Sequence, residues 1–233
     1  MKKYQHWLLI GTLALAISGI LAGCGSSSAS TSSSSSSSTA SSSSAVTKKT
    51  SSSLLTKTST NDAKKDPALS TVLKETTSKF KQYSYKDPKT GVTLKYNLYV
   101  PANYSKKKSY PLVSFIHDDS FTGKSTTASL TQGYGGTIWA TPSEQAKHPS
   151  FVLVPTFSSS TISGGMNQFG SSVVKKNVQT YLDLLTSLEG KYSINKNRLY
   201  GTGQSMGGMT MFYLNSHYPK LFAATLYVAS QWE

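Results

Sequence analysis

The sequence predicts an α/β fold with a mostly parallel sheet and flanking helices. Two apolar runs, PLVSFIH at 111–117 and FVLVPTF at 151–157, are short and nearly continuous, as in strands buried on both faces of such a sheet. Later in the chain, a strand pattern at 198–203 precedes a helix pattern at 206–218 and a further strand pattern at 222–229. Strand, helix and strand in that order indicate parallel strands joined by a right-handed crossover.

Residues 1–23 have the pattern of an export signal that ends before a cysteine. MKKYQHW is basic, LLIGTLALAISGIL is apolar, and LAGC places small residues before Cys24. The apolar run at 8–22 is shorter than the roughly 20 residues that span a bilayer, which argues against a membrane helix. The LAGC box resembles that of bacterial lipoproteins and implies cleavage before Cys24 and a diacylglycerol on its sulfur. An ordinary signal peptide is the alternative.

Two acyl chains are enough for stable membrane anchoring, so the resemblance implies a protein held at the outer face of a bacterial cytoplasmic membrane. Residues 24–65 are then predicted to be a disordered tether, because serine and threonine dominate and too few apolar side chains remain to offset the entropy of ordering. The remaining residues, 66–233, are assigned to one domain, which is long enough for an ordinary core.

Charge and composition limit the kinds of partner and cofactor that this protein is expected to bind. The formal net charge is +14, but the lysines are scattered and Arg198 is the only arginine, so no nucleic-acid-binding motif emerges. Anionic lipids and cell-wall polymers are the expected partners of this charge. No metal or cofactor is expected, because Cys24 is assigned to lipid and the four histidines, His6, His117, His148 and His217, lack ligand spacing.

The domain is expected to open with a hairpin. Segments 80–85 and 93–100 alternate apolar with polar residues, and KDPKTG between them has turn chemistry. A short helix is predicted at TPSEQAKH, with Thr141 as the N-cap, Pro142 at the first position and Glu144 three residues after the cap.

A long helix is predicted at 171–190. Its apolar stripe lies at intervals of three or four residues and is expected to face the core, with Gly190 ending the helix. The stripe consists of Val174, Val178, Tyr181, Leu185 and Leu188.

The sequence GTGQSMGGM contains a G-x-S-x-G pattern with Ser205 at its centre. The pattern falls between the predicted strand and helix, where a tight turn exposes the serine above the positive end of the helix. Side chains at Gly203 and Gly207 are expected to collide with the adjoining elements. A dinucleotide loop is excluded because Met206 stands where the third glycine is needed, and a turn without chemistry is the simpler alternative.

Several further segments give a family resemblance from Phe80 to the last residue. YNLYVPANYSKKKSYPLVSFIHD, IWATPSEQAKHPSFVLVPTF, INKNRLYGTGQSMGGM and YPKLFAATLYVASQW occur in order. Together they resemble the α/β-hydrolases, and within them secreted esterases and predicted peptidases related to feruloyl esterases and polyhydroxybutyrate depolymerases. The resemblance implies that Ser205 is the nucleophile and that the backbone N–H of Met206 binds the oxyanion.

The same resemblance places a second oxyanion donor in the loop after SFIH, at Asp118. A carboxylate beside a developing negative charge is unfavourable unless it points away. His117 matches a family histidine that positions this loop and does not act as the base.

The family orders its triad as serine, acid and histidine. After Ser205 only Glu233 carries a side-chain carboxylate and only His217 an imidazole, and His217 is expected to face away from the serine. The sequence analysis therefore expects the last strands, the acid and the base to lie outside this chain, through truncation, a partial sequence or a second polypeptide.

Two functions follow. The first is a surface-anchored serine hydrolase acting on an ester or, less favoured, an amide, incomplete in this chain. The alternative is a non-catalytic lipoprotein whose degenerate hydrolase domain binds envelope material.

Overall fold

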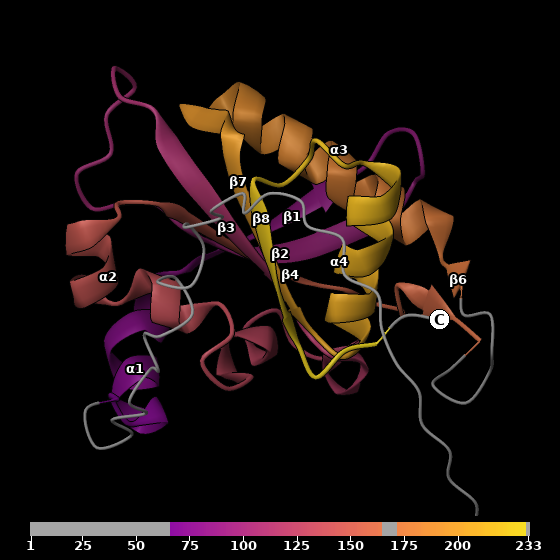
Figure 1. The fold of residues 1–233 in the computed structure, drawn as a ribbon, viewed down its shortest axis with the longest axis horizontal. Helices are drawn as coiled ribbons and strands as arrows, with labels where there is room; N and C mark the ends of the chain where they lie inside the picture. The colour runs from indigo at the N-terminus through magenta and orange to yellow at the C-terminus, as the bar shows by residue number, and fades with distance from the viewer. Residues whose placement is uncertain (1–65, 165–171, 232–233) are drawn as a thin grey trace, which may run out of the picture. The chain divides into compact units, whose positions relative to one another are not determined.

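The computed structural model describes residues 66–164 and 172–231. The predicted signal, the tether and Cys24 lie outside these residues. A six-stranded sheet with the order β1-β2-β4-β3-β7-β8 forms the centre of the described part (Figure 1). Its strands are β1 (Lys81–Lys86), β2 (Thr93–Tyr99), β3 (Tyr110–Ile116), β4 (Phe151–Thr156), β7 (Ile194–Gln204) and β8 (Ala224–Val228).

The strand directions confirm the predicted fold class. β3 runs parallel to both β4 and β7, and β7 runs parallel to β8. The predicted hairpin is also present, since β1 pairs antiparallel with β2, which in turn pairs antiparallel with β4. The larger helices are α1 (Leu69–Thr76), α2 (Pro142–Lys147), α3 (Lys175–Lys191) and α4 (Met206–His217).

The central strands are buried on both faces, which explains their continuous apolar sequences. Along β3, Leu112 and Ile116 pack into a large core beneath α3 and α4, while Phe115 packs into a smaller core on the opposite face. The alternation follows from the two-residue period of a strand. The smaller core lies on the side of α1 and α2 (Figure 1), so the two faces of the sheet are unequally covered.

Helix α2 begins as its sequence predicts. The Thr141 hydroxyl accepts a hydrogen bond from the Glu144 N–H, and Pro142 occupies the first turn, where its missing N–H costs nothing. The Glu144 carboxylate lies 3.8 Å from Lys147 in an exposed ion pair.

Helix α3 corrects the prediction at both ends. It starts at Lys175, not 171, because residues 172–173 form β6, which pairs with β5 (Ile162–Ser163), and the N–H of Val174 donates to the Thr161 carbonyl. Gly190 does not end the helix, which runs on to Lys191. The next residue is Tyr192, whose ring packs 5.1 Å from that of Phe151.

Four 3₁₀ helices and α1 have no counterpart in the predictions. Their sequences are short, and helices of this length depend on tertiary contacts more than on local propensity. None of the helices between 66 and 231, outside the gap at 165–171, combines the length and apolar character that crossing a membrane requires.

Candidate active site

Ser205 occupies the turn between β7, which ends at Gln204, and α4, which begins at Met206. Its backbone has φ 48° and ψ −115°, a conformation that L-residues rarely adopt. The surrounding chain imposes it: the Ser205 N–H donates to the Val228 carbonyl at 3.0 Å, and its own carbonyl accepts from Met209 at 2.9 Å. Backbone strain that neighbouring structure maintains in this way is typical of functional sites.

Two glycines make this tight turn feasible. A Cβ at Gly203 would overlap the backbone of Gly207, and a Cβ at Gly207 would overlap the carbonyl group of Ile116, whose carbon would lie only 2.6 Å away. Both collisions agree with the sequence-based expectation. The bare backbone at 207 lets the first turn of α4 rest directly on the end of β3.

Ser205 lines a cavity of about 300 Å³. The other lining residues come from the loop after β3, the segment around β5 and the start of α4: Asp118, Asp119, Ser120, Ser160, Ile162, Met206 and Met209. The cavity thus combines the serine with an apolar wall of Ile162 and Met209 and a polar wall of two aspartates. Its volume is at the lower end of the range for small-ligand sites.

Contacts of the Met206 side chain fix this residue at the start of α4. Its buried thioether sulfur accepts from the Ser160 hydroxyl at 3.3 Å and from the Thr161 N–H at 3.5 Å. As the first residue of α4, Met206 has no intrahelical acceptor for its own N–H. That N–H and the positive end of the helix therefore lie beside Ser205.

The N–H of Asp118, predicted as the second oxyanion donor, is already hydrogen-bonded in this structure. It donates to the Gln132 side-chain oxygen at 3.0 Å, and the amide nitrogen of Gln132 donates to the Asp118 carboxylate at 2.6 Å. The other carboxylate oxygen accepts from the N–H and hydroxyl of Ser120. The carboxylate is thus tied to three donors, whereas the N–H of Asp119 donates to no other described residue.

His117 holds the same loop from beneath. Its ring is fully buried; Nε2 accepts from the Phe157 N–H at 3.0 Å, so Nδ1 carries the proton and donates to the Asp118 carbonyl at 2.6 Å. Both nitrogens are therefore occupied, which supports the expected positioning role and argues against His117 as the base. Burial lowers the pKa of His117 below its ordinary value, because the charged ring loses hydration.

This lowered pKa predicts a pH-dependent stability. Below about pH 6.5 the unfolded chain takes up a proton that the folded chain resists, so stability is expected to fall as the pH drops from 7 to 5, by up to about 1.4 kcal/mol per pH unit from this group. Thermal melts of the wild type and His117→Gln test this, with the exposed His148→Asn as control. The expectation is wrong if His117→Gln keeps the wild-type pH dependence.

The other described histidines lie away from the serine. His217 is the last residue of α4, a 12-residue helix about 18 Å long whose first residue adjoins Ser205. It stacks on Tyr213, with ring centroids 3.9 Å apart. His148 follows α2 and lines a separate cavity. Within 66–164 and 172–231, no group of three or more metal-ligating side chains comes together.

Sequence analysis missed Gln132 altogether. The sequence carries little sign of its role, because Gln132 lies 14 residues from Asp118 in an irregular stretch. Only the folded loop brings the two residues together. A glutamine that is 94 % buried in a polar loop becomes conspicuous only once its burial is known.

No protein-family model and no curated protein sequence matches this chain. Among solved structures, it is similar to a thermostable esterase, with 33% identity and a TM-score of 0.58 over 64% of this chain and 40% of that one. It is also similar to a ferulic acid esterase, with 15% identity and a TM-score of 0.50 over 65% of this chain and 59% of that one. The chain thus spans well under two thirds of the length of either protein.

Proposed function

We propose that this chain, which has the α/β-hydrolase fold, is a serine hydrolase that cleaves carboxylic esters with Ser205 as the nucleophile. One observation carries the proposal: Ser205 sits in a strained strand-to-helix turn, partly exposed in a cavity at the positive end of α4. A structural serine has no need of such a conformation, whereas a nucleophile gains exposure from it. The 33% identity to an esterase supports the reaction class.

In this proposal the Ser205 oxygen attacks the ester carbonyl carbon, and the negative charge that develops on the carbonyl oxygen is held by backbone donors. The N–H of Met206 is the first donor, as predicted. For the second we propose the N–H of Asp119, because that of Asp118 is bound to Gln132. Each such donor is worth about 10²- to 10³-fold in rate.

Collapse of the tetrahedral intermediate breaks the bond to the alcohol oxygen and leaves an acyl-serine, which water then hydrolyses to the acid. A base must accept the serine proton and return it to the departing alcohol. His117 is hydrogen-bonded through both ring nitrogens and the other described histidines lie away from Ser205. We therefore propose that the base and its acid come from outside the described residues. Without them, the non-catalytic alternative, binding of envelope material, is favoured.

The substrate is proposed as an ester, small or polymer-linked, in preference to an amide. Ester turnover by the protein with and without the Ser205 hydroxyl tests the assignment. No metal or cofactor enters the proposed steps, because proton transfer and backbone donors supply the chemistry.

We also propose that the protein is exported and anchored through a lipid on Cys24, near anionic lipids and wall polymers. The LAGC box and the single cysteine support this. Cys24→Ala is expected to leave an uncleaved precursor or to release the protein into the medium. Mass spectrometry of the N-terminal peptide is the direct measurement, and an unmodified Cys24 in the wild type would contradict the proposal.

A further inference from the structure

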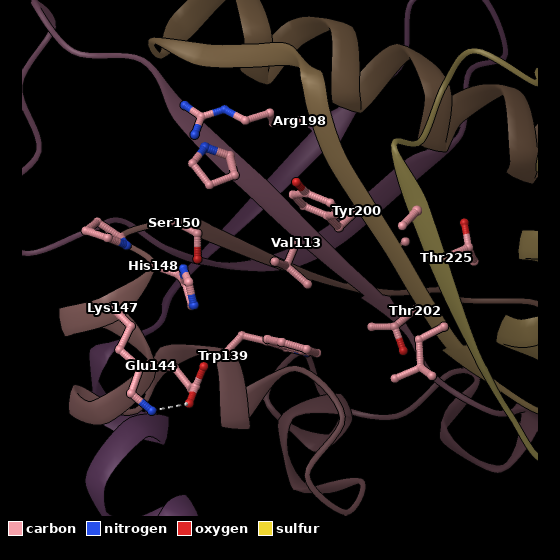
Figure 2. Close-up of a pocket in the computed structure, with 15 residues that line it drawn as sticks. Val113, Trp139, Glu144, Lys147, His148, Ser150, Arg198, Tyr200, Thr202 and Thr225 are labelled. Carbon is pink, nitrogen blue, oxygen red and sulfur yellow. Dashed lines mark ion pairs between the residues drawn. The ribbon is translucent and has the colours of Figure 1, made fainter. Parts of the chain in front are cut away.

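A second and larger cavity, of about 510 Å³, lies over the face of the sheet opposite α3 and α4 (Figure 2). It shares no lining residue with the cavity of Ser205. Its floor is formed where β3, β7 and β8 lie side by side, with Val113, Tyr200 and Leu226 among the lining side chains. The smaller core takes its strand residues from β2, β3 and β4 and none from β7 or β8, so the sheet stays accessible toward β8, where Leu226 is 54% exposed.

The walls of this cavity are chemically unequal. One side is apolar, because the Trp139 indole, Val113 and Tyr200 line it, with Val113 between the other two (Figure 2). Cations lie at two ends of the cavity: Lys147 and His148 at the end of α2, and Arg198 on β7 at the far end (Figure 2). Glu144 is the one carboxylate among the lining residues and lies 3.8 Å from Lys147.

Two polar groups of this cavity differ in whether a ligand can reach them. The Arg198 guanidinium donates one hydrogen bond to the Ser109 carbonyl at 2.8 Å, which holds it at the rim with other N–H groups remaining. The Trp139 indole N–H is buried and has no acceptor within the described residues. Because that N–H has no exposed surface, Trp139 offers the cavity its ring and not a hydrogen-bond donor.

We propose that this cavity binds a small aromatic carboxylate. The volume suits a ligand of that size. A planar apolar group would lie on Val113 and Tyr200, and its carboxylate would face Arg198. Charge complementarity selects the anion, because the rim carries more cations than carboxylates.

The test uses the full chain and 3-phenylpropionate as the probe, with calorimetric titration as the readout. A Kd on the order of 0.1–1 mM is expected for a ligand of this size. The neutral isostere 3-phenylpropanamide is expected to bind at least about tenfold more weakly, because it lacks the charge. Because this readout needs no ester turnover, its result is independent of the proposed hydrolase activity.

Matched variants locate the site. Arg198→Gln is expected to weaken 3-phenylpropionate about three- to tenfold. Lys147→Gln should bind almost as the wild type does, because Lys147 is paired with Glu144 at the other end of the cavity. Lys196→Gln is the control, because Lys196 also pairs with a glutamate at 3.8 Å but lies outside the cavity. These lysine and arginine side chains are exposed, so the variants should fold.

Three results would overturn the proposal. 3-Phenylpropionate and 3-phenylpropanamide could bind with equal affinity. That result would indicate an apolar surface that binds another polypeptide segment or a second copy of the chain. Arg198→Gln could bind no differently from Lys196→Gln. Finally, 3-phenylpropionate could show no binding up to about 10 mM.

Discussion

In the protein with its base and acid in place, replacing Ser205 with alanine is expected to lower kcat for ester hydrolysis by about 10⁶-fold, the loss typical of removing the serine from an intact triad. The reason is direct: the Ser205 oxygen forms the bond to the acyl carbon, and a methyl group cannot. The fold should survive, because alanine adopts φ 48° at a cost similar to that of serine and the backbone hydrogen bonds to Val228 and Met209 remain. Release of p-nitrophenol from p-nitrophenyl acetate measures the rate.

Two other hydroxyls in the same cavity provide matched controls. Ser120 donates to the Asp118 carboxylate and Ser160 donates to the Met206 sulfur. Ser120→Ala and Ser160→Ala should therefore retain most of the turnover. If either of them loses as much as Ser205→Ala, the nucleophile is misassigned. A wild type no faster than Ser205→Ala contradicts catalysis by this protein and favours the envelope-binding alternative.

Covalent labelling reports on the nucleophile separately from turnover. A fluorophosphonate probe should modify the folded wild type at Ser205 and leave Ser205→Ala unmodified, with mass spectrometry locating the adduct. A labelled Ser205 with slow turnover would support the proposal that the base comes from outside the described residues. Labelling that is equal in the two proteins would contradict the nucleophile assignment.

The sequence predicts the sheet well because burial on both faces leaves a strong local signal. The runs that became β3 and β4 are almost wholly apolar, and in the structure both strands contribute to both cores. The turn at Ser205 is predictable for a similar reason, since glycines at 203 and 207 are needed by contacts within a few residues and with one neighbouring strand. Local constraints of this kind remain visible in a sequence.

The details of the oxyanion loop were not predictable, because they depend on distant partners. The N–H of Asp118 is bound by Gln132, and His117 reaches the N–H of Phe157, 40 residues away. Neither contact has a periodicity or a spacing that a sequence would show. The same holds for the cavity of Figure 2, whose lining side chains come from α2, β3, β7 and β8 and share a cavity only in the folded protein.

Among glycine-to-alanine substitutions in the described fold, Gly207→Ala is expected to be the most destabilising. The added Cβ would overlap the carbonyl of Ile116, which is backbone at the end of β3 and cannot rotate away as a side chain could. Overpacking typically costs about 1–3 kcal/mol and occasionally more, and here we expect at least about 3 kcal/mol. Gly190→Ala is the control, because nothing lies within 4 Å of its Cβ and alanine in a helix should stabilise by about 0.5–1 kcal/mol.

The functional consequence of Gly207→Ala should exceed its effect on stability. The contact between Gly207 and Ile116 sets how closely α4 approaches the loop that begins at His117, and therefore how far the Met206 N–H lies from that of Asp119. A shift of a few tenths of an ångström that relieves the overlap would separate the two donors and weaken the oxyanion site. Denaturant unfolding and fluorophosphonate labelling of both alanine variants measure the two effects. If Gly207→Ala has the same unfolding stability and labelling rate as Gly190→Ala, the close contact between Gly207 and Ile116 does not determine the geometry of the oxyanion site.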